Sequence, residues 1–473
     1  MEAQSRSLEW EARPLSELLR LAWPITVSTL SYSIMTLVDT LLVGHLGPAS
    51  LAGVGLGGTA AFALICFSFG LLRGVKTLVS QAVGAGRSDL VPFYRGAALA
   101  TAVVLGVMTM ALGPWVAALM QRLSATAEAG DAARLYLSIR NLAAPLALVS
   151  VALREVRYGE GDARTPMLAT VVANLVNIAL ACLLVFALKR GVGGAAWATV
   201  VAQLVEAGFL WLLGRRRGLR ARAATMEHVR ELWRIGLPTA LQFMLEVGSF
   251  VLLASMIASL SETQMAAHQI ALQVCQFSFL PAYAVAEAAS VLAGQAVGAR
   301  RQELVPRIAR LGLRTASVYT IFCSLVFAVA GRTIAAGFTG DATLAATAVR
   351  LLYVAAVFQA FDGANIVARA ILRGVGDVRF AAVVGVVTAW IMTPPLAWLL
   401  GYRAGLGAFG GWLGLCGETI IGAFILWHRL KSGKWRTIAE ATRAQATGAD
   451  ASADATGADK AVAEAVTATE AAG

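Results

Sequence analysis

The chain has 473 residues, of which 58% are hydrophobic and 14% charged. Its mean hydropathy is +0.70, whereas soluble globular chains carry about 25% charged residues. Apolar runs of roughly 20 residues, long enough to cross a hydrocarbon core of about 30 Å, recur along the whole sequence. No single soluble core can bury so many of them. The composition therefore excludes a large soluble helical protein and predicts an all-α integral membrane protein.

Twelve transmembrane helices are predicted from the apolar runs, in the following order along the chain. They cover residues 21–43, 54–80, 95–119, 133–155, 166–188, 193–214, 234–258, 267–293, 311–331, 344–371, 379–400 and 407–428. This pattern divides the chain into five parts. These are an N-terminal segment (1–20), a first six-helix lobe (21–214), a basic linker (215–233), a second six-helix lobe (234–430) and an Ala/Thr/Asp/Gly-rich tail (437–473).

The tail from 437 contains no aromatic residue and few large apolar ones. Such a composition does not bury enough surface to offset the entropy of folding. We expect residues 437–473 to be disordered and to play no part in transport.

The net charge of +11 is concentrated in loops rather than in a DNA-binding patch. If the N-terminus is cytoplasmic, the loops on that side hold most of the Lys and Arg residues, which is the positive-inside pattern. The seven arginines between 215 and 234 are the densest group, and they favour contact with anionic lipid headgroups over nucleic acid. The pattern predicts a multi-pass protein of the cell inner (cytoplasmic) membrane with both termini in the cytoplasm.

An internal repeat relates the two lobes. Pro24 and Pro238 lie 214 positions apart (238 − 24), and the same offset brings "VSQAVGAGR" onto "AGQAVGARR", with Gln81 on Gln295. At an offset of 215, "GEGDAR" (159–164) aligns with "GVGDVR" (374–379). Each repeat has six helices, so both enter the membrane in the same sense. We therefore expect two six-helix bundles related by a pseudo-twofold axis along the membrane normal, with a substrate site between lobes that rock.

Several motifs, in this order and spacing, resemble those of the MATE (multidrug and toxic compound extrusion) transporters, NorM-like branch. They are "PITVSTLSYSIMTLVDTLLVGHLGPASLAGVGLG", the paired "QAVGAGR" and "GQAVGARR", "IGLPTALQFMLEVGSF", "MAAHQIALQV", "FDGANIVARAILRGVGDVR" and "GGWLGL". The resemblance covers about residues 15–430. It implies a two-bundle fold and the export of amphipathic organic cations against an inward Na⁺ or H⁺ gradient.

Three carboxylates lie inside predicted helices and are candidate cation-coupling residues: Glu246, Asp362 and Asp39. Glu246 has no basic residue within one turn on its own helix, and Asp362 is similarly deep. An isolated anion in the membrane is costly, so each side chain is expected to bind a proton or a cation. Glu246 and Asp362 would supply ligands if the ion is Na⁺. In the NorM-like branch, the resemblance implies acidic residues with this role at all three positions.

Asn174, Asn177 and Thr199 offer uncharged oxygen atoms and form a secondary cation-site candidate in the first lobe. In the DinF-like branch of the family, an Asp follows the Asn that Asn177 resembles by one turn. Here that position is Ala181, which moves the expectation toward the second lobe.

Other charged residues in the predicted helices are expected to be structural or to balance charge. Arg73 and Lys76 lie one turn apart and are expected to pair with a carboxylate across the cleft. Glu206 and Glu418 are expected to pair or to reach the interface, and Glu287 to be a packing or gating residue. The candidates for lining the substrate cleft are Met35, Phe243, Met244, Phe277, Phe279, Tyr283, Arg73 and Lys76.

Two other functions are weighed against a drug exporter. A flippase for lipid-linked or anionic cargo would use Arg73, Lys76 and Arg369, whereas the acidic trio favours cationic cargo. An enzyme lacks support, because the sequence has no His cluster, paired-Cys metal spacing or Ser nucleophile motif. No Gly-x4-Gly-Lys-Ser/Thr loop occurs, so ATP is not expected to drive transport. No cofactor is expected beyond the coupling ion. Each chain carries both lobes, so a monomer is expected to suffice.

Overall fold

The computed structural model describes residues 7–124, 126–216, 222 and 224–447, and within them every regular element is a helix. The elements are α1 (Pro14–Gly44), α2 (Pro48–Leu72), α3 (Gly74–Gly84), α4 (Val91–Leu123), α5 (Ala127–Asn141), α6 (Ala144–Gly159), α7 (Arg164–Cys182), α8 (Gly191–Arg216), α9 (Met226–Ala258), α10 (Glu262–Gly298), α11 (Val305–Phe338), α12 (Ala342–Val375), α13 (Val378–Leu396), α14 (Ala408–Ser432) and α15 (Trp435–Ala446). Short π-helical turns extend α7 and α13.

In the described part of the chain, eleven helices are long and apolar enough to span a membrane, if α2 and α3 are counted as one helix. A twelfth is the pair α5 and α6, which bends by 52° at a short break. The prediction of twelve spans is therefore confirmed. The spans predicted over 54–80 and 133–155 are each broken, the first of them at Arg73.

The segment boundaries differ from those expected at the N-terminus and at the linker. The first helix begins at Pro14 rather than 21, because Leu18 and Leu21 already contribute a buried face. The predicted linker over 215–233 is shorter, since α8 continues to Arg216 and α9 begins at Met226. Linker residues 217–221 and 223, and residues 1–6 of the N-terminal segment, lie outside the described residues.

The prediction that disorder begins at 437 was wrong for its first ten residues. Helix α15 runs from Trp435 to Ala446, and its buried face is formed by Trp435, Ala439, Thr442 and Ala446. These residues repeat at helical spacing, and the anchoring Trp435, 1% exposed, lies just before the region that was judged on composition. The rest of the predicted tail, 448–473, lies outside the described residues.

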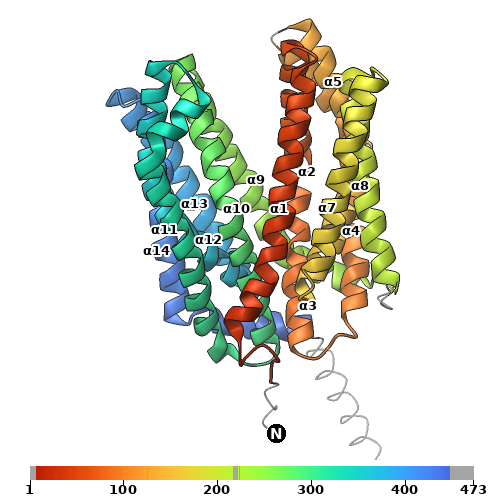
Figure 1. Cartoon of the computed structure of the whole chain (residues 1–473). Helices are drawn as coiled ribbons and strands as arrows, with labels where there is room; N and C mark the ends of the chain where they lie inside the picture. The colour runs from red at the N-terminus through yellow and green to blue at the C-terminus, as the bar shows by residue number, and fades with distance from the viewer. Residues whose placement is uncertain (1–6, 125, 217–221, 223, 448–473) are drawn as a thin grey trace, which may run out of the picture.

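Two lobes are visible in Figure 1: α1–α8 on one side and α9–α14 on the other. The lobes meet near the end where α1 begins and α15 lies, here called the terminal end, and their helices diverge toward the opposite end. The contact at the terminal end depends on small residues. A Cβ atom built on Gly70 would lie 2.7 Å from the Cα of Ala240, and one on Gly74 would lie 2.8 Å from the backbone of Gly236. The backbones of α2, α3 and α9 therefore touch directly.

The pseudo-twofold relation is seen in reciprocal contacts between equivalent residues. A Cβ on Gly84 would lie 2.1 Å from the carbonyl oxygen of Gln295, and a Cβ on Gly298 would lie 2.0 Å from that of Gln81. Gly84 is equivalent to Gly298, and Gln81 to Gln295, at the offset of 214. In a twofold arrangement, a contact between two residues is repeated by a contact between their two equivalents. The contacts of Gly84 and Gly298 have this form.

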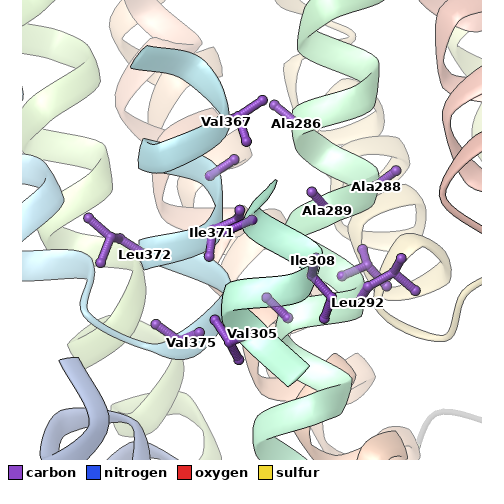
Figure 2. Packing of buried hydrophobic residues seen from close by; sticks show 14 of the residues in the cluster. Ala286, Ala288, Ala289, Leu292, Val305, Ile308, Val367, Ile371, Leu372 and Val375 are labelled. Carbon is purple, nitrogen blue, oxygen red and sulfur yellow. The ribbon is translucent and has the colours of Figure 1, made fainter. Parts of the chain in front are cut away.

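The second lobe is packed around the terminal half of α10, in which every residue from 284 to 298 is buried. Figure 2 shows Ala286 and Ala289 of this helix beside Val367 and Ile371 of α12. Alanines on α10 let the neighbouring helices approach closely, as small residues do at interfaces between membrane helices. This rigid layer supports the charged residues of α10 and α12.

Replacing Gly84 by Ala should destabilise the contact between the lobes, because the added methyl group meets backbone atoms that have no rotamer to escape into. Overpacking of this kind costs about 1–3 kcal/mol. We expect a lower thermal unfolding midpoint for the purified protein in detergent. Gly55 is the matched control, since a Cβ there meets nothing within 4 Å. Equal midpoints for Gly84→Ala and Gly55→Ala would contradict the packing described.

Candidate functional site

A buried cluster of four charged residues joins the two lobes near the terminal end; we call it the inter-lobe ion cluster (Arg73, Lys76, Glu155 and Glu287). Both Arg73 and Lys76 donate to the carboxylate of Glu287, and the Lys76 Nζ lies 3.9 Å from the Glu155 Oε2. Each side chain is no more than 8% exposed. A cavity of about 10 Å³ beside them has room for at most one water. The cluster is therefore a dry ion pair network.

Glu287 is the member from the second lobe, and the other three come from the first lobe. The expectation that Arg73 and Lys76 pair with a carboxylate across the lobes is confirmed. Glu287, expected to be a packing or gating residue, is that carboxylate. Arg73 and Glu287 are 214 positions apart, so they are equivalent residues of the two repeats. The repeat alignment places opposite charges at these two equivalent positions. This was the signal in the sequence for the pair, and the sequence analysis missed it.

Glu246 on α9 is not the isolated carboxylate that the sequence predicted. The Arg369 Nη1 of α12 donates to the Glu246 Oε1 at 2.6 Å, and the Gln242 Nε2 donates to the same oxygen at 2.8 Å. The sequence shows no basic residue near Glu246 on its own helix, but the partner, Arg369, comes from α12. The Glu246 side chain is still 23% exposed, so it remains accessible from outside the packed core.

Asp362 on α12, unlike Glu246, forms no ion pair with another described residue. It is 7% exposed, and its Oδ2 is buried without a hydrogen-bond donor. Arg369 and Glu418 lie within electrostatic range of it. Arg373 of the same helix lies within electrostatic range of both Glu246 and Arg369, so the group of Asp362, Glu246, Glu418, Arg369 and Arg373 contains three acids and two bases. With all five ionised, this group would carry an excess of one negative charge, which favours the uptake of a proton or a cation.

Glu206 and Glu418 both have partners, one in each lobe. Glu206 accepts a hydrogen bond from the Thr170 Oγ1 at 2.8 Å and lies 3.6 Å from the Arg154 Nη1. Glu418 accepts from the Thr393 Oγ1 at 2.6 Å. The expected pairing is therefore confirmed. Arg154 and Arg369 are as far apart in sequence as Gly159 and Gly374, so each lobe has an equivalent arginine that binds a glutamate.

The secondary cation-site candidates of the first lobe are only partly brought together. The Asn177 Nδ2 donates to the Thr199 Oγ1 at 3.3 Å, and the Asn177 Oδ1 is buried without a partner. Asn174 instead donates to the Ser31 Oγ of α1 at 2.8 Å. The structure thus places one free amide oxygen between α7 and α8, without a carboxylate among these three residues.

Asp39 on α1 is half-buried, with one carboxylate oxygen that has no hydrogen-bond partner. Arg140 of α5 lies within electrostatic range of it. Asp39 lies near the end opposite the terminal end, whereas Glu246 and Asp362 belong to the second lobe. The structure therefore separates Asp39 from the other two candidates.

The candidate cleft residues fall into three environments. Phe243 lies between the lobes, with its ring 5.8 Å from Phe69 and 6.2 Å from Phe62 of α2. Tyr283 stacks on Phe279 and faces the guanidinium of Arg73 at 5.4 Å. Met244 and Phe277 are exposed, and Met35 is buried. Arg73 and Lys76 are closed off in the ion cluster, so they do not line an open surface in this conformation.

No set of three or more His, Cys, Asp or Glu side chains in the described ranges is arranged to hold a metal ion. An ion held by Asp362 would need uncharged oxygens or water as further ligands.

Comparison with known proteins gives the family. The MatE family model matches residues 24–183 and 238–399, one match in each repeat. The chain belongs to the MATE family. It is therefore a multi-pass membrane transporter and not an enzyme.

Relatives of this MATE transporter include the "Probable multidrug resistance protein NorM" of Pseudomonas syringae pv. tomato, 31% identical over 91% of this chain and 97% of the relative. The protein of the same name from Pseudomonas putida is 32% identical over 85% of this chain and 90% of the relative. A solved structure described as the outward-facing conformation of a multidrug resistance MATE family transporter superposes with a TM-score of 0.82 at 23% identity, covering 89% of this chain and 96% of that one. A Pyrococcus furiosus transporter with a binding pocket of reverse polarity superposes with a TM-score of 0.83, also at 23% identity, covering 89% and 97%. These structures share the fold of the MATE transporter described here.

Proposed function

We propose that the protein is a secondary active multidrug exporter, which moves amphipathic organic cations outward in exchange for Na⁺ or H⁺. The observation that carries the proposal is Asp362, a buried carboxylate with an unpartnered oxygen in a group of three acids and two bases. With one excess negative charge, such a group is neutralised by either a small cation or an organic cation, and binding both would leave an excess of positive charge. Competition for the same negative charge is the basis of exchange.

We place the terminal end in the cytoplasm of a cell that exports across its inner membrane, following the charge asymmetry of the loops. In this orientation the lobes are closed toward the cytoplasm by the inter-lobe ion cluster, and their helices diverge toward the outside (Figure 1). Ions from outside would reach Glu246 first, since its side chain is partly exposed. Loading of Asp362 would then favour the return of the lobes to the inward-facing state.

Cationic cargo is favoured over anionic or lipid-linked cargo by the partners of the basic residues. Arg73 and Lys76 are neutralised by Glu287, and Arg369 by Glu246. These three basic residues are therefore occupied, whereas Asp362 is not. The names of the relatives at 31% and 32% identity agree with a multidrug cargo.

Efflux of ethidium from cells that express the chain tests the proposal. Wild-type protein should lower the accumulated dye, and Glu246→Gln should slow efflux by about tenfold or more, because Arg369 would lose its partner and neutralise the nearby Asp362 instead. Glu262→Gln, at an exposed position on α10, should behave as wild type. Retention of wild-type efflux by Glu246→Gln, or absence of efflux of any organic cation from wild-type cells, would overturn the proposal.

A further inference from the structure

A cavity of about 510 Å³ lies at the terminal end between the start of α1 and the start of α11, outside the site described above. Four arginines line it: Arg13, Arg307, Arg310 and Arg314. The last three repeat at spacings of three and four residues, so they share one face of α11. All four side chains are exposed, so the cavity is an open basic pocket.

The arginines of this pocket are not neutralised by the protein. None of the four forms an ion pair with another described residue. The neighbouring acids are engaged elsewhere: Glu17 binds Arg20, and Glu11 and Glu303 both bind Arg301. Four positive charges in one cavity repel one another, so the pocket favours a polyvalent or strongly localised anion. Guanidinium groups bind phosphate oxygens by paired hydrogen bonds.

The surface next to the pocket shows which anion fits. On α11 the arginine face continues into apolar residues that are the most exposed of the helix, among them Val318 at 74% and Val329 at 84%. On α1, Leu15 and Leu19 are also about half exposed, at 46% and 45%. Apolar side chains exposed along a membrane-spanning helix face acyl chains. The pocket thus joins a site for phosphate to two surfaces for lipid tails.

We propose that this pocket binds the headgroup of an anionic phospholipid of the adjacent leaflet, with the acyl chains along α1 and α11. Basic pockets between helices at the membrane surface bind such headgroups. Because α1 belongs to the first lobe and α11 to the second, the lipid would touch both lobes at their closed end. The proposal does not depend on what the transporter carries.

Lipid binding can be measured on the full chain in detergent by native mass spectrometry, titrating cardiolipin or phosphatidylglycerol against phosphatidylcholine. Each arginine near an anionic surface contributes roughly fivefold to affinity. Arg310→Gln/Arg314→Gln should therefore weaken cardiolipin binding by about thirtyfold and leave phosphatidylcholine binding unchanged. The matched control is Arg332→Gln/Arg350→Gln, which removes two exposed arginines from the opposite end.

The source of the phosphate group is distinguished by a second titration with inorganic phosphate and pyrophosphate, followed by thermal unfolding. Stabilisation by cardiolipin but not by these salts supports a lipid site. Equal stabilisation by pyrophosphate would overturn the lipid assignment in favour of a soluble anion. Equal cardiolipin affinity for wild type and the Arg310/Arg314 variant would overturn the site itself. Ethidium efflux is not needed for any of these readings.

Discussion

Replacing Asp362 by Asn is expected to abolish ion-coupled efflux while the protein still reaches the membrane. The amide has the same shape but is permanently neutral, so it neither takes up nor releases a cation. Because the Asp362 Oδ2 has no donor to lose, the substitution removes a costly unpaired anion and breaks no bond to that oxygen. We expect efflux to fall to the level of cells without the protein. The thermal midpoint should be unchanged or higher.

Asp341→Asn is the matched control for this prediction. Asp341 caps the start of the same helix by accepting from the backbone of Thr343 and Leu344, and Asn caps a helix as well as Asp does. Efflux by this variant should equal that of wild type. If Asp362→Asn retains ion-coupled efflux, the coupling role assigned to Asp362 is wrong.

Reversing the charge on either side of the inter-lobe ion cluster should be severe, and reversing both should restore activity. Arg73→Glu brings three carboxylates together, and Glu287→Arg brings three cations together, in a dry environment. Breaking a buried ion pair costs about 3–5 kcal/mol, or roughly 10²–10⁴ in an equilibrium. Each single variant should therefore lose at least about a hundredfold in efflux, and the double variant should recover most of it.

The double variant is informative because Arg73 and Glu287 occupy equivalent positions in the repeats. Exchanging their charges preserves the pair and the total charge of the cluster. Recovery in a double-mutant cycle of efflux rates would show that the pair acts as a unit. A double variant no better than either single variant would mean that the side chains act through other contacts. Membrane abundance is measured in parallel, so that loss of protein is not read as loss of transport.

The fold was largely predictable from sequence because lipid exposure requires long uncharged helices, and because the repeat sets their arrangement. The reciprocal contacts of Gly84 and Gly298 follow from the same offset that aligned Gln81 with Gln295. Helix α15 was missed because its anchor, Trp435, precedes the segment judged on composition. Helix breaks such as that at Arg73 depend on contacts with other helices, which local apolarity does not encode.

The charged residues were found from sequence, but their partners were not all found. Intramembrane carboxylates stand out from their apolar surroundings, so Glu246 and Asp362 were evident. Their states depend on Arg369, which lies seven residues from Asp362 on its own helix but pairs with Glu246 on another. The direction in which each side chain points between the helices determines that Glu246 is paired with Arg369 and that Asp362 is not. The ion pair of Arg73 and Glu287 was within reach of the repeat alignment, since the two residues differ by the repeat offset.

Reconstitution into liposomes tests the central claim most directly. Liposomes that contain the purified protein are loaded with ethidium on one side of the membrane. A Na⁺ gradient and a pH gradient are then imposed in separate experiments, without ATP. We predict that one of the two gradients drives ethidium against its concentration gradient in wild-type vesicles and in Asp341→Asn vesicles, but not in Asp362→Asn vesicles. If neither gradient drives ethidium in wild-type vesicles, or if Asp362→Asn vesicles respond as wild type does, carboxylate-coupled exchange at Asp362 is contradicted.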